Sequence, residues 1–222
     1  MLKIVIFDSG YGGEFFADRL SAELPIVEII RVINWRKADV FLNNPREARK
    51  IARESLLPYI GKVDLVIFAN YLLTITSLKY FQRNFKNQLF IGLNLTPPDT
   101  FVKKDVLVLS TTAVSKTLRF HTFIHGIKRN IHTINLNSWP EKIDDGELNF
   151  DETLETLARF IKKIPGYHPK EIILASSQFE DIKNDLKTIF GPSTRIYDGF
   201  DEAIRQTCIK LRIRGSAKKK AK

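Results

Sequence analysis

Polar side chains follow four apolar segments of the sequence, at positions where they could hold a small ligand. The segment "KIVIF" runs directly into Asp-Ser-Gly-x-Gly-Gly, and three later apolar segments also end in hydroxyl, amide or phenol side chains. The positions are Asp8 and Ser9, Asn70 and Tyr71, Thr111 and Thr112, and Ser176, Ser177 and Gln178. Such groups can orient a small polar ligand, but most of these residue types also cap helices. The residues alone leave both interpretations open.

The sequence offers little metal or thiol chemistry. His121 and His125 are four residues apart and could share a helix face, but no carboxylate lies within that stretch and no third ligand is evident. Cys208 is the single cysteine, which excludes an internal disulfide and a multi-cysteine metal site. We expect Cys208 to pack within the last helix. No metal site is therefore predicted.

The glycines of the first motif predict a structural role for it. Gly10, Gly12 and Gly13 lack the spacing of a dinucleotide-binding fingerprint, and the Lys-Ser/Thr ending of a phosphate loop is absent. Glycine tolerates positive φ and allows another segment to approach its backbone closely. We therefore expect a tight turn with positive φ and close packing of the following helix, with Asp8 capping that helix.

Short apolar segments alternate with amphipathic ones, and this alternation predicts the elements that position the polar residues. Buried strands are predicted at residues 3–7, 63–70, 89–95, 105–111, 131–136 and 171–177. Helices are predicted over 44–60 and 151–164, with Asn44 and Asp151 as N-caps and Pro45 at the first helical position. The pattern predicts an α/β fold with a mainly parallel sheet, in which ligands bind beyond the carboxyl ends of the strands.

Composition sets the class of protein. With 222 residues and 44% hydrophobic content, the chain can form one large domain or two small ones. No apolar run is long enough to span a bilayer and no signal sequence is evident, so we expect a cytoplasmic protein without membrane contact. The net charge is +10, and a basic tail at 215–222 holds Lys218, Lys219, Lys220 and Lys222. This tail could bind nucleic acid non-specifically, or it could be a solvated, disordered terminus.

The first motif, "FDSGYGG", resembles the N-terminal signature of glutamate racemases and of the wider aspartate/glutamate racemase superfamily, which is Phe-Asp-Ser-Gly-x-Gly-Gly. Later segments resemble further family motifs in the same order: "LVIFAN", "IGLNLTP", "IILASSQF" and "RIYDGFDEAI". The resemblance covers most of residues 1–210, and the basic tail has no counterpart in the family.

This resemblance implies the domain organisation. Members of the family have two pseudo-symmetric α/β domains with parallel sheets, which face each other across a cleft. The first domain is expected at 1–97 together with 196–214, the second at 98–195, and the tail at 215–222. The resemblance also implies catalysis without a cofactor, an amino acid or other small carboxylate as ligand, and a homodimer.

Family members racemise by means of two cysteines, because one thiol removes the α-proton and the other delivers a proton to the opposite face. By resemblance, Ala69 and Ser176 stand at these positions, and Gln178 stands where the family has a histidine. Alanine carries no exchangeable proton, and an unassisted serine hydroxyl is a weak base. The resemblance therefore implies a pseudoenzyme. Asp144 and Asp145 fall near an acidic family position, but we expect a polar surface loop there.

The resemblance also implies a set of ligand contacts. The predicted ligand-binding residues are Asp8, Ser9, Asn70, Tyr71, Thr111, Ser177 and Gln178. Among them, Asp8, Ser9 and Asn70 match the family, and Ser177 replaces a threonine with another hydroxyl. Tyr71 replaces a smaller threonine and could fill the space that an amino-acid substrate uses. A site that the Tyr71 side chain fills, and that binds no ligand, is therefore the alternative to a ligand-binding site.

Three functional hypotheses follow. The first is a glutamate racemase-like protein without racemase activity that binds a small carboxylate. The second is an active isomerase or one-base lyase of the same superfamily that uses Asp8 with Ser176, which requires burial to raise the pKa of Asp8. The third is a nucleic-acid-associated protein that acts through its basic tail, whose binding would weaken steeply with salt.

Overall fold

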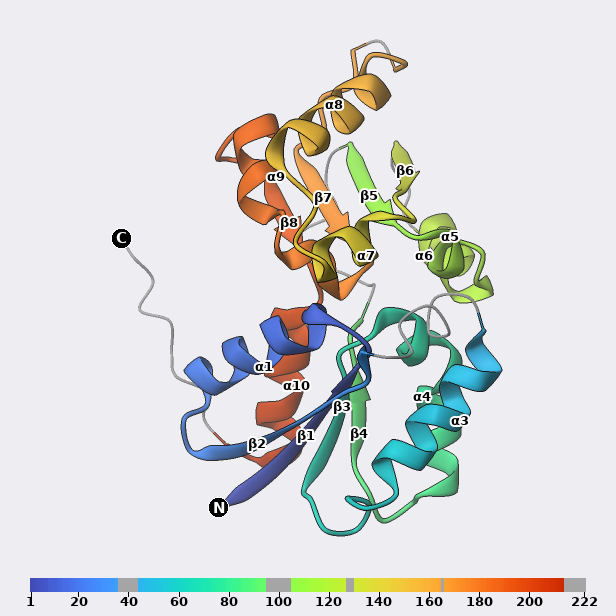
Figure 1. The fold of residues 1–222 in the computed structure, drawn as a ribbon, viewed down its shortest axis with the longest axis vertical. Coiled ribbons are helices and arrows are strands. Elements are labelled where there is room, and N and C mark those ends of the chain that lie inside the picture. The colour runs from blue at the N-terminus through green and yellow to red at the C-terminus, as the bar shows by residue number, and fades with distance from the viewer. Residues whose placement is uncertain (36–43, 95–104, 127–129, 165, 214–222) are drawn as a thin grey trace. The chain divides into compact units, whose positions relative to one another are not determined.

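The computed structural model describes residues 1–35, 44–94, 105–126, 130–164 and 166–213 (Figure 1). The chain divides into two compact units. Unit 1 comprises Met1–Asn94 and Phe200–Lys222, and unit 2 comprises Leu95–Gly199. No helix in the described ranges is both long and apolar enough to cross a membrane.

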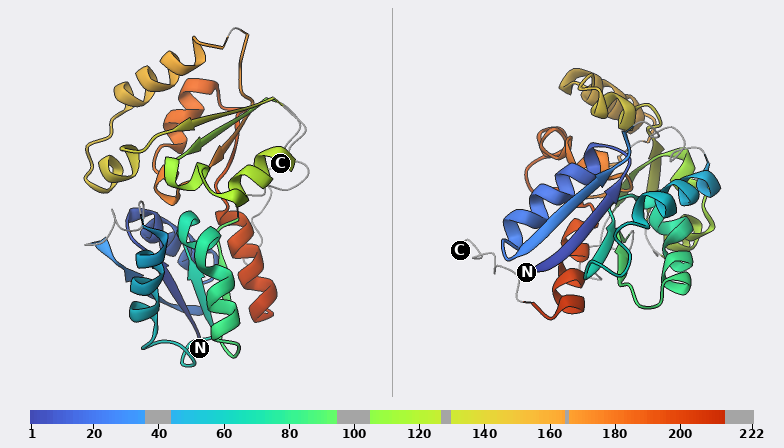
Figure 2. Two further views of the ribbon diagram at one scale, coloured as in Figure 1. Left: turned by 90° about the vertical axis from the view of Figure 1, so that its right-hand side faces the viewer. Right: turned by 60° about the horizontal axis from the view of Figure 1, so that its bottom comes forward.

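Unit 1 is a parallel sheet of four strands in the order β2-β1-β3-β4, with helices on both faces. Its elements are β1 (Leu2–Asp8), α1 (Tyr11–Glu23), β2 (Val27–Ile33), α3 (Pro45–Leu56), β3 (Leu65–Phe68), α4 (Tyr71–Asn84), β4 (Phe90–Gly92) and α10 (Phe200–Leu211). Helices α3 and α4 cover one face and α1 and α10 the other (Figure 2).

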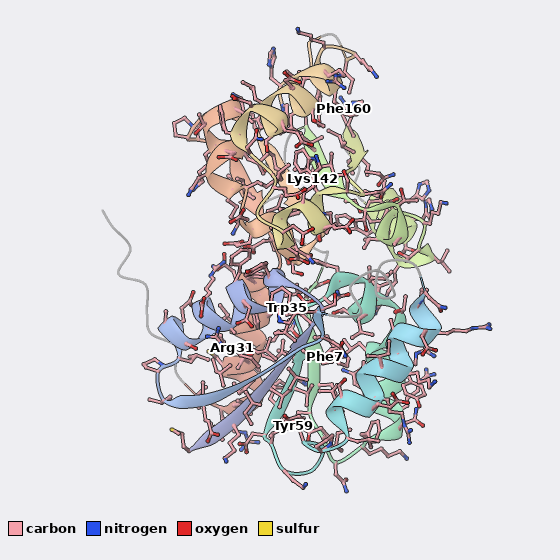
Figure 3. All side chains as sticks on the ribbon, viewed as in Figure 1. Phe7, Arg31, Trp35, Tyr59, Lys142 and Phe160 are labelled. Carbon is pink, nitrogen blue, oxygen red and sulfur yellow. The ribbon has the colours of Figure 1, made fainter. Side chains whose placement is uncertain are left out.

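The side chains of β1 point alternately to the two faces of this sheet and pack on both. Phe7 points into a cluster with α3 and α4, where its ring lies 6.2 Å from that of Phe68 (Figure 3). On the other face, the ring of Phe16 in α1 meets that of Phe200 edge to face at 5.0 Å. Phe200 is fully buried. This contact, together with the ion pair of Arg19 and Asp201, anchors α10 to α1.

Unit 2 repeats the same design with the strand order β6-β5-β7-β8, again all parallel. Its elements are β5 (Val106–Ser110), α5 (Thr112–Ser115), α6 (Leu118–Gly126), β6 (Ile131–Asn135), α7 (Trp139–Asp144), α8 (Phe150–Ile161), β7 (Glu171–Leu174), the short 3-10 helix η2 (Ser177–Glu180), α9 (Lys183–Phe190) and β8 (Arg195–Tyr197). The two identical strand orders confirm the predicted fold of two pseudo-symmetric parallel-sheet α/β domains. The facing arrangement across a cleft stays a prediction.

The division of the chain differs from the expected one at both boundaries, since the first falls after Asn94 and not after residue 97. Strand β8 pairs with β7, with Ile172 opposite Ile196. Residues 196–199 therefore lie in unit 2, whereas the sequence prediction starts the return to the first domain at 196. The chain rejoins unit 1 at Phe200, where α10 begins.

The predicted strands contain β3, β4, β5, β6 and β7, and the strand predicted at 3–7 lies within β1, which extends one residue further at each end. The sequence does not predict β2, because this edge strand is half-exposed and carries charged residues. Arg31 of β2 donates to Glu14 Oε2 at 2.5 Å and to Asp18 Oδ1 at 2.6 Å, both on α1 (Figure 3). The strand is thus held by ion pairs on its exposed side as well as by the sheet.

The two predicted helix starts have different outcomes. Asn44 caps α3 as predicted, since its Oδ1 accepts from the Glu47 N–H at 3.2 Å, and Pro45 is the first helical residue. Asp151 is wrong as an N-cap, because Asn149 Oδ1 accepts from the Glu152 N–H at 3.0 Å and α8 begins at Phe150. Asp151 instead lies in the first turn of α8, where its charge suits the helix dipole.

Candidate functional site

The first group of candidate residues lies at the carboxyl ends of β1 and β3. Phe7 and Phe68 are paired in adjacent parallel strands, so the residues that follow them meet at one edge of the sheet. Asn70 Nδ2 donates to Asp8 Oδ1 at 2.9 Å and approaches Ser9 Oγ at 3.5 Å. All three side chains are buried. The structure therefore brings together the three residues that match the family.

The Asp8 carboxylate and the Asn70 amide are both held in place by the backbone. Asp8 Oδ1 also accepts from the Ser9 N–H at 2.7 Å, and two donors on one oxygen stabilise the ionised form of a carboxylate. Asn70 is the N-cap of α4, since its Oδ1 accepts from the Leu73 N–H at 2.9 Å. The start of α4 thus orients the amide toward Asp8.

The glycines of the first motif allow close packing but no unusual turn. A Cβ atom at Gly13 would lie 2.5 Å from Asp8 Cβ and 2.7 Å from Ile33 Cδ1, so only glycine allows α1 to approach β1 this closely. The expected positive φ is wrong, because Gly10 is extended at φ −165° and Gly12 and Gly13 are not among the glycines with positive φ. The expected cap is also wrong, since Gly10 is the N-cap and α1 has no side-chain cap.

Ala69 and Tyr71 flank Asn70. Ala69 is completely buried, and its N–H donates to the Phe7 carbonyl at 2.9 Å. Tyr71 is the first residue of α4 and only 2% exposed. Asn70 is therefore flanked in the sequence by a buried methyl group and a buried phenol ring. Whether the ring excludes an amino acid stays a prediction.

In unit 2, the corresponding candidates follow β5 and β7. Thr111 Oγ1 accepts from the Val114 N–H at 3.4 Å and caps α5. After β7, Ser176 Oγ donates to Gln178 Oε1 at 2.8 Å, and Ser177 Oγ lies 3.4 Å from the same oxygen. These three side chains after β7 are buried. Gln178 is thus the residue that both serines of the second group contact.

Asp144 belongs to this second group, which the sequence does not predict. Gln178 Nε2 donates to Asp144 Oδ2 at 3.4 Å, and Asp144 is the last residue of α7. The interpretation of residues 144–145 as a polar surface loop is therefore wrong for Asp144, which is half-buried, although Asp145 is exposed. The near match of Asp144 to an acidic family position was the signal for this contact.

A third group of charged side chains lies beyond β7 and β8, and sequence reasoning missed it. Lys183 Nζ lies 2.5 Å from Glu180 Oε2 and also pairs with Asp198. The pKa of Glu180 is raised to about 8, mainly by burial and also by a hydrogen bond to Asp198 and the charge of Asp198, against the smaller effect of Lys183. The only sequence signal is the spacing of three residues between Glu180 and Lys183.

The remaining candidates are the histidine pair, Cys208 and the basic tail. His121 and His125 are exposed on α6, and no group of three His, Cys, Asp or Glu residues in the described ranges could hold a metal ion. Cys208 is half-buried in α10. The basic tail lies outside the described residues, so its binding to nucleic acid stays a prediction, as does the homodimer.

Similarity to solved structures identifies the fold. By sequence, the chain matches no protein-family profile and no curated protein. It is similar to glutamate racemase from Escherichia coli in complex with L-glutamate and the activator UDP-MurNAc-ala, with TM-score 0.79, 19% identity and coverage of 100% of this chain and 86% of that chain. Glutamate racemase from Campylobacter jejuni subsp. jejuni matches with TM-score 0.77, 21% identity and coverage of 98% and 88%. Allantoin racemase from Pseudomonas fluorescens matches with TM-score 0.61, 14% identity and coverage of 98% and 95%.

These matches confirm the resemblance at the level of fold. The chain has the fold of the aspartate/glutamate racemase superfamily, and the glutamate racemases have higher TM-scores than the allantoin racemase. Identities near 20% establish the fold alone.

Proposed function

We propose that the chain is a glutamate racemase-like protein that binds a small carboxylate, such as an amino acid, and does not racemise it. Its fold supports a ligand of this class, since a glutamate racemase of the same fold is known in complex with L-glutamate. The observation that carries the proposal is the pair Ala69 and Ser176. They follow β3 and β7, which hold the same place in two sheets of identical strand order.

Racemisation needs a proton acceptor and a proton donor on opposite faces of the α-carbon. Ala69 can be neither. The Ser176 hydroxyl donates to the side-chain oxygen of Gln178, and an amide cannot take up the proton as a histidine would. The residues at the two family positions therefore lack both the thiols and the base that would activate a substitute.

Binding requires only donors for the ligand's oxygens. Ser9 Oγ accepts from Asn70, which leaves the Ser9 hydroxyl proton for a ligand carboxylate. The Ser177 hydroxyl follows β7 and lies 3.4 Å from Gln178 Oε1. Hydroxyl donors of this kind bind a carboxylate without any acid-base chemistry.

The complete burial of Asp8 favours a second candidate, a one-base isomerase or lyase. Burial makes a carboxylate a stronger base, whereas the donors from Ser9 and Asn70 oppose this effect. These opposing effects make Asp8 the residue to test.

The test is exchange of the α-proton of L- and D-glutamate and aspartate in heavy water, followed by NMR with the full chain. We expect no catalysed exchange, together with saturable changes in the protein's amide shifts when glutamate is added. Exchange that disappears in Asp8→Asn would overturn the non-catalytic proposal and establish the one-base alternative. The absence of any shift change would contradict the binding proposal.

A matched pair of variants locates the binding. Asn70→Ser keeps a side-chain oxygen to cap α4 but removes the amide that contacts Asp8 and Ser9, so we expect weaker glutamate binding. Asn84→Ser makes the same change at the other end of α4, where the side chain is exposed, and should leave binding unchanged. Equal glutamate affinities of the two variants would show that glutamate does not bind at this group of residues.

A further inference from the structure

A pocket of about 450 Å³ lies in unit 2, away from the residues that follow β5 and β7. It is lined by Lys183 and Lys187 of α9, by the loop at 192–194, and by Arg195 and Ile196 of β8. All lining residues fall within fourteen consecutive positions, so unit 2 forms the pocket by itself. Its volume is in the range of sites for small ligands.

The pocket is positively charged. Three cationic side chains line it, and two of them are fixed by carboxylates: Arg195 Nη1 lies 3.3 Å from the buried Glu171, and Lys183 pairs with Asp198. Glu180 also contacts Lys183. All three cations line the pocket, whereas none of these three carboxylates is among its lining residues, so the surface of the pocket is positively charged.

Two donors in the pocket have no partner within the described part of the chain. Lys187 is exposed and makes no ion pair there, and the Ser193 hydroxyl makes no hydrogen bond there. The neighbouring Thr194 hydroxyl donates to the Phe190 carbonyl at 2.9 Å, which fixes the loop. Gly191, at φ +96°, allows the turn that ends α9 and brings Ser193 toward the pocket.

We propose that this pocket binds a phosphorylated small molecule, with Lys187 and Ser193 as its direct donors and Lys183 and Arg195 as fixed positive charges. Lysine, arginine and hydroxyl groups together match the several acceptor oxygens and the negative charge of a phosphate. Pro192 and Ile196 provide an apolar wall for the organic part of the ligand. The pocket does not share residues with the groups proposed to bind the small carboxylate, so each proposal can fail without the other.

The experiment is a titration of the isotope-labelled full chain with inorganic pyrophosphate, followed by amide chemical shifts. We expect saturable shift changes centred on residues 183–196. Lys187→Ala and Ser193→Ala should each weaken binding, by about tenfold for the charged lysine contact. Lys162→Ala removes an exposed positive charge elsewhere in unit 2 and should leave the affinity unchanged.

Three results would overturn the proposal. Shift changes confined to the basic tail would mean that pyrophosphate binds to net charge alone. An equal loss of pyrophosphate affinity in Lys187→Ala and Lys162→Ala would mean that pyrophosphate binds to the net charge of unit 2 and not to the pocket. Equal affinity for acetate or citrate and for pyrophosphate would show that the pocket does not select phosphate.

Discussion

Replacing Gly13 with alanine tests whether the first motif is required for packing. The new Cβ would lie 2.5 Å from Asp8 Cβ and 2.7 Å from Ile33 Cδ1, whereas carbon atoms in ordinary contact lie about 3.5–4.0 Å apart. Helix α1 must therefore move away from the sheet by about 1 Å. Asp8 cannot yield easily, because it ends a buried strand between β2 and β3 and accepts from Asn70.

The size of the effect follows from two opposing contributions. Overpacking of this kind destabilises by about 1–3 kcal/mol, and alanine is favoured over glycine in a helix by at most about 1 kcal/mol. We expect Gly13→Ala to lower the free energy of unfolding of unit 1 by about 1–2 kcal/mol.

Urea unfolding followed by tryptophan fluorescence can measure this loss. Of the two tryptophans, Trp35 lies in unit 1 with its ring 4.7 Å from that of Tyr11 (Figure 3), and Trp139 lies in unit 2. A Trp139→Phe background therefore leaves a reporter beside the motif. Adding Ile33→Val removes one of the two close contacts and should restore part of the stability. Gly13→Ala with unchanged stability and unchanged glutamate binding would refute the packing argument.

Three further predictions concern stability. Asn149→Ala removes the cap of α8 and should destabilise by about 1 kcal/mol, whereas Asp151→Ala should cost less, as thermal unfolding would show. Between its ordinary pKa of 4.5 and about 8, Glu180 keeps a proton in the folded state that the unfolded state releases. The free energy of unfolding should therefore fall as pH rises from 5 to 8, and Glu180→Gln should flatten this fall in urea unfolding. Phe200→Ala removes a fully buried ring that packs on Phe16 and should destabilise unit 1 by about 3–5 kcal/mol, and a smaller loss would mean that α10 is held mainly by other contacts.

Strands buried on both faces are the part of the fold that the sequence predicts well. Every residue of β3, β5 and β7 is buried, so each strand appears as an apolar run, with a polar residue only at one end of β5 (Ser110) and of β7 (Glu171). The edge strands β2 and β8 give no such signal, although the edge strands β4 and β6 lie within predicted strands. In β2 only Val27 is buried, and β8 has three residues, too few to stand out beside a turn.

The candidate site is predictable where the sheet itself brings residues together. Asp8 and Asn70 meet because β1 and β3 are adjacent and parallel, which the alternation of strands and helices already indicates. The contact of Gln178 with Asp144 joins residues 34 positions apart through the end of α7. No periodicity in the sequence predicts this contact, because it depends on how α7 packs against η2.

The arrangement around Gln178 gives a final prediction about what catalysis would require. Cysteines at 69 and 176 would supply the thiols that the family resemblance implies at these positions, but Ser176→Cys would still face the Gln178 amide, which cannot accept a proton. We therefore expect the double variant Ala69→Cys/Ser176→Cys to leave glutamate unchanged in the heavy-water assay. Adding Gln178→His would place an imidazole beside the new thiol, and Asp144, which now accepts from Gln178 Nε2 at 3.4 Å, could accept its N–H and orient it. Proton exchange in the triple variant alone would show that the base at 178 is needed together with the thiols, whereas exchange in the double variant would show that the thiols suffice.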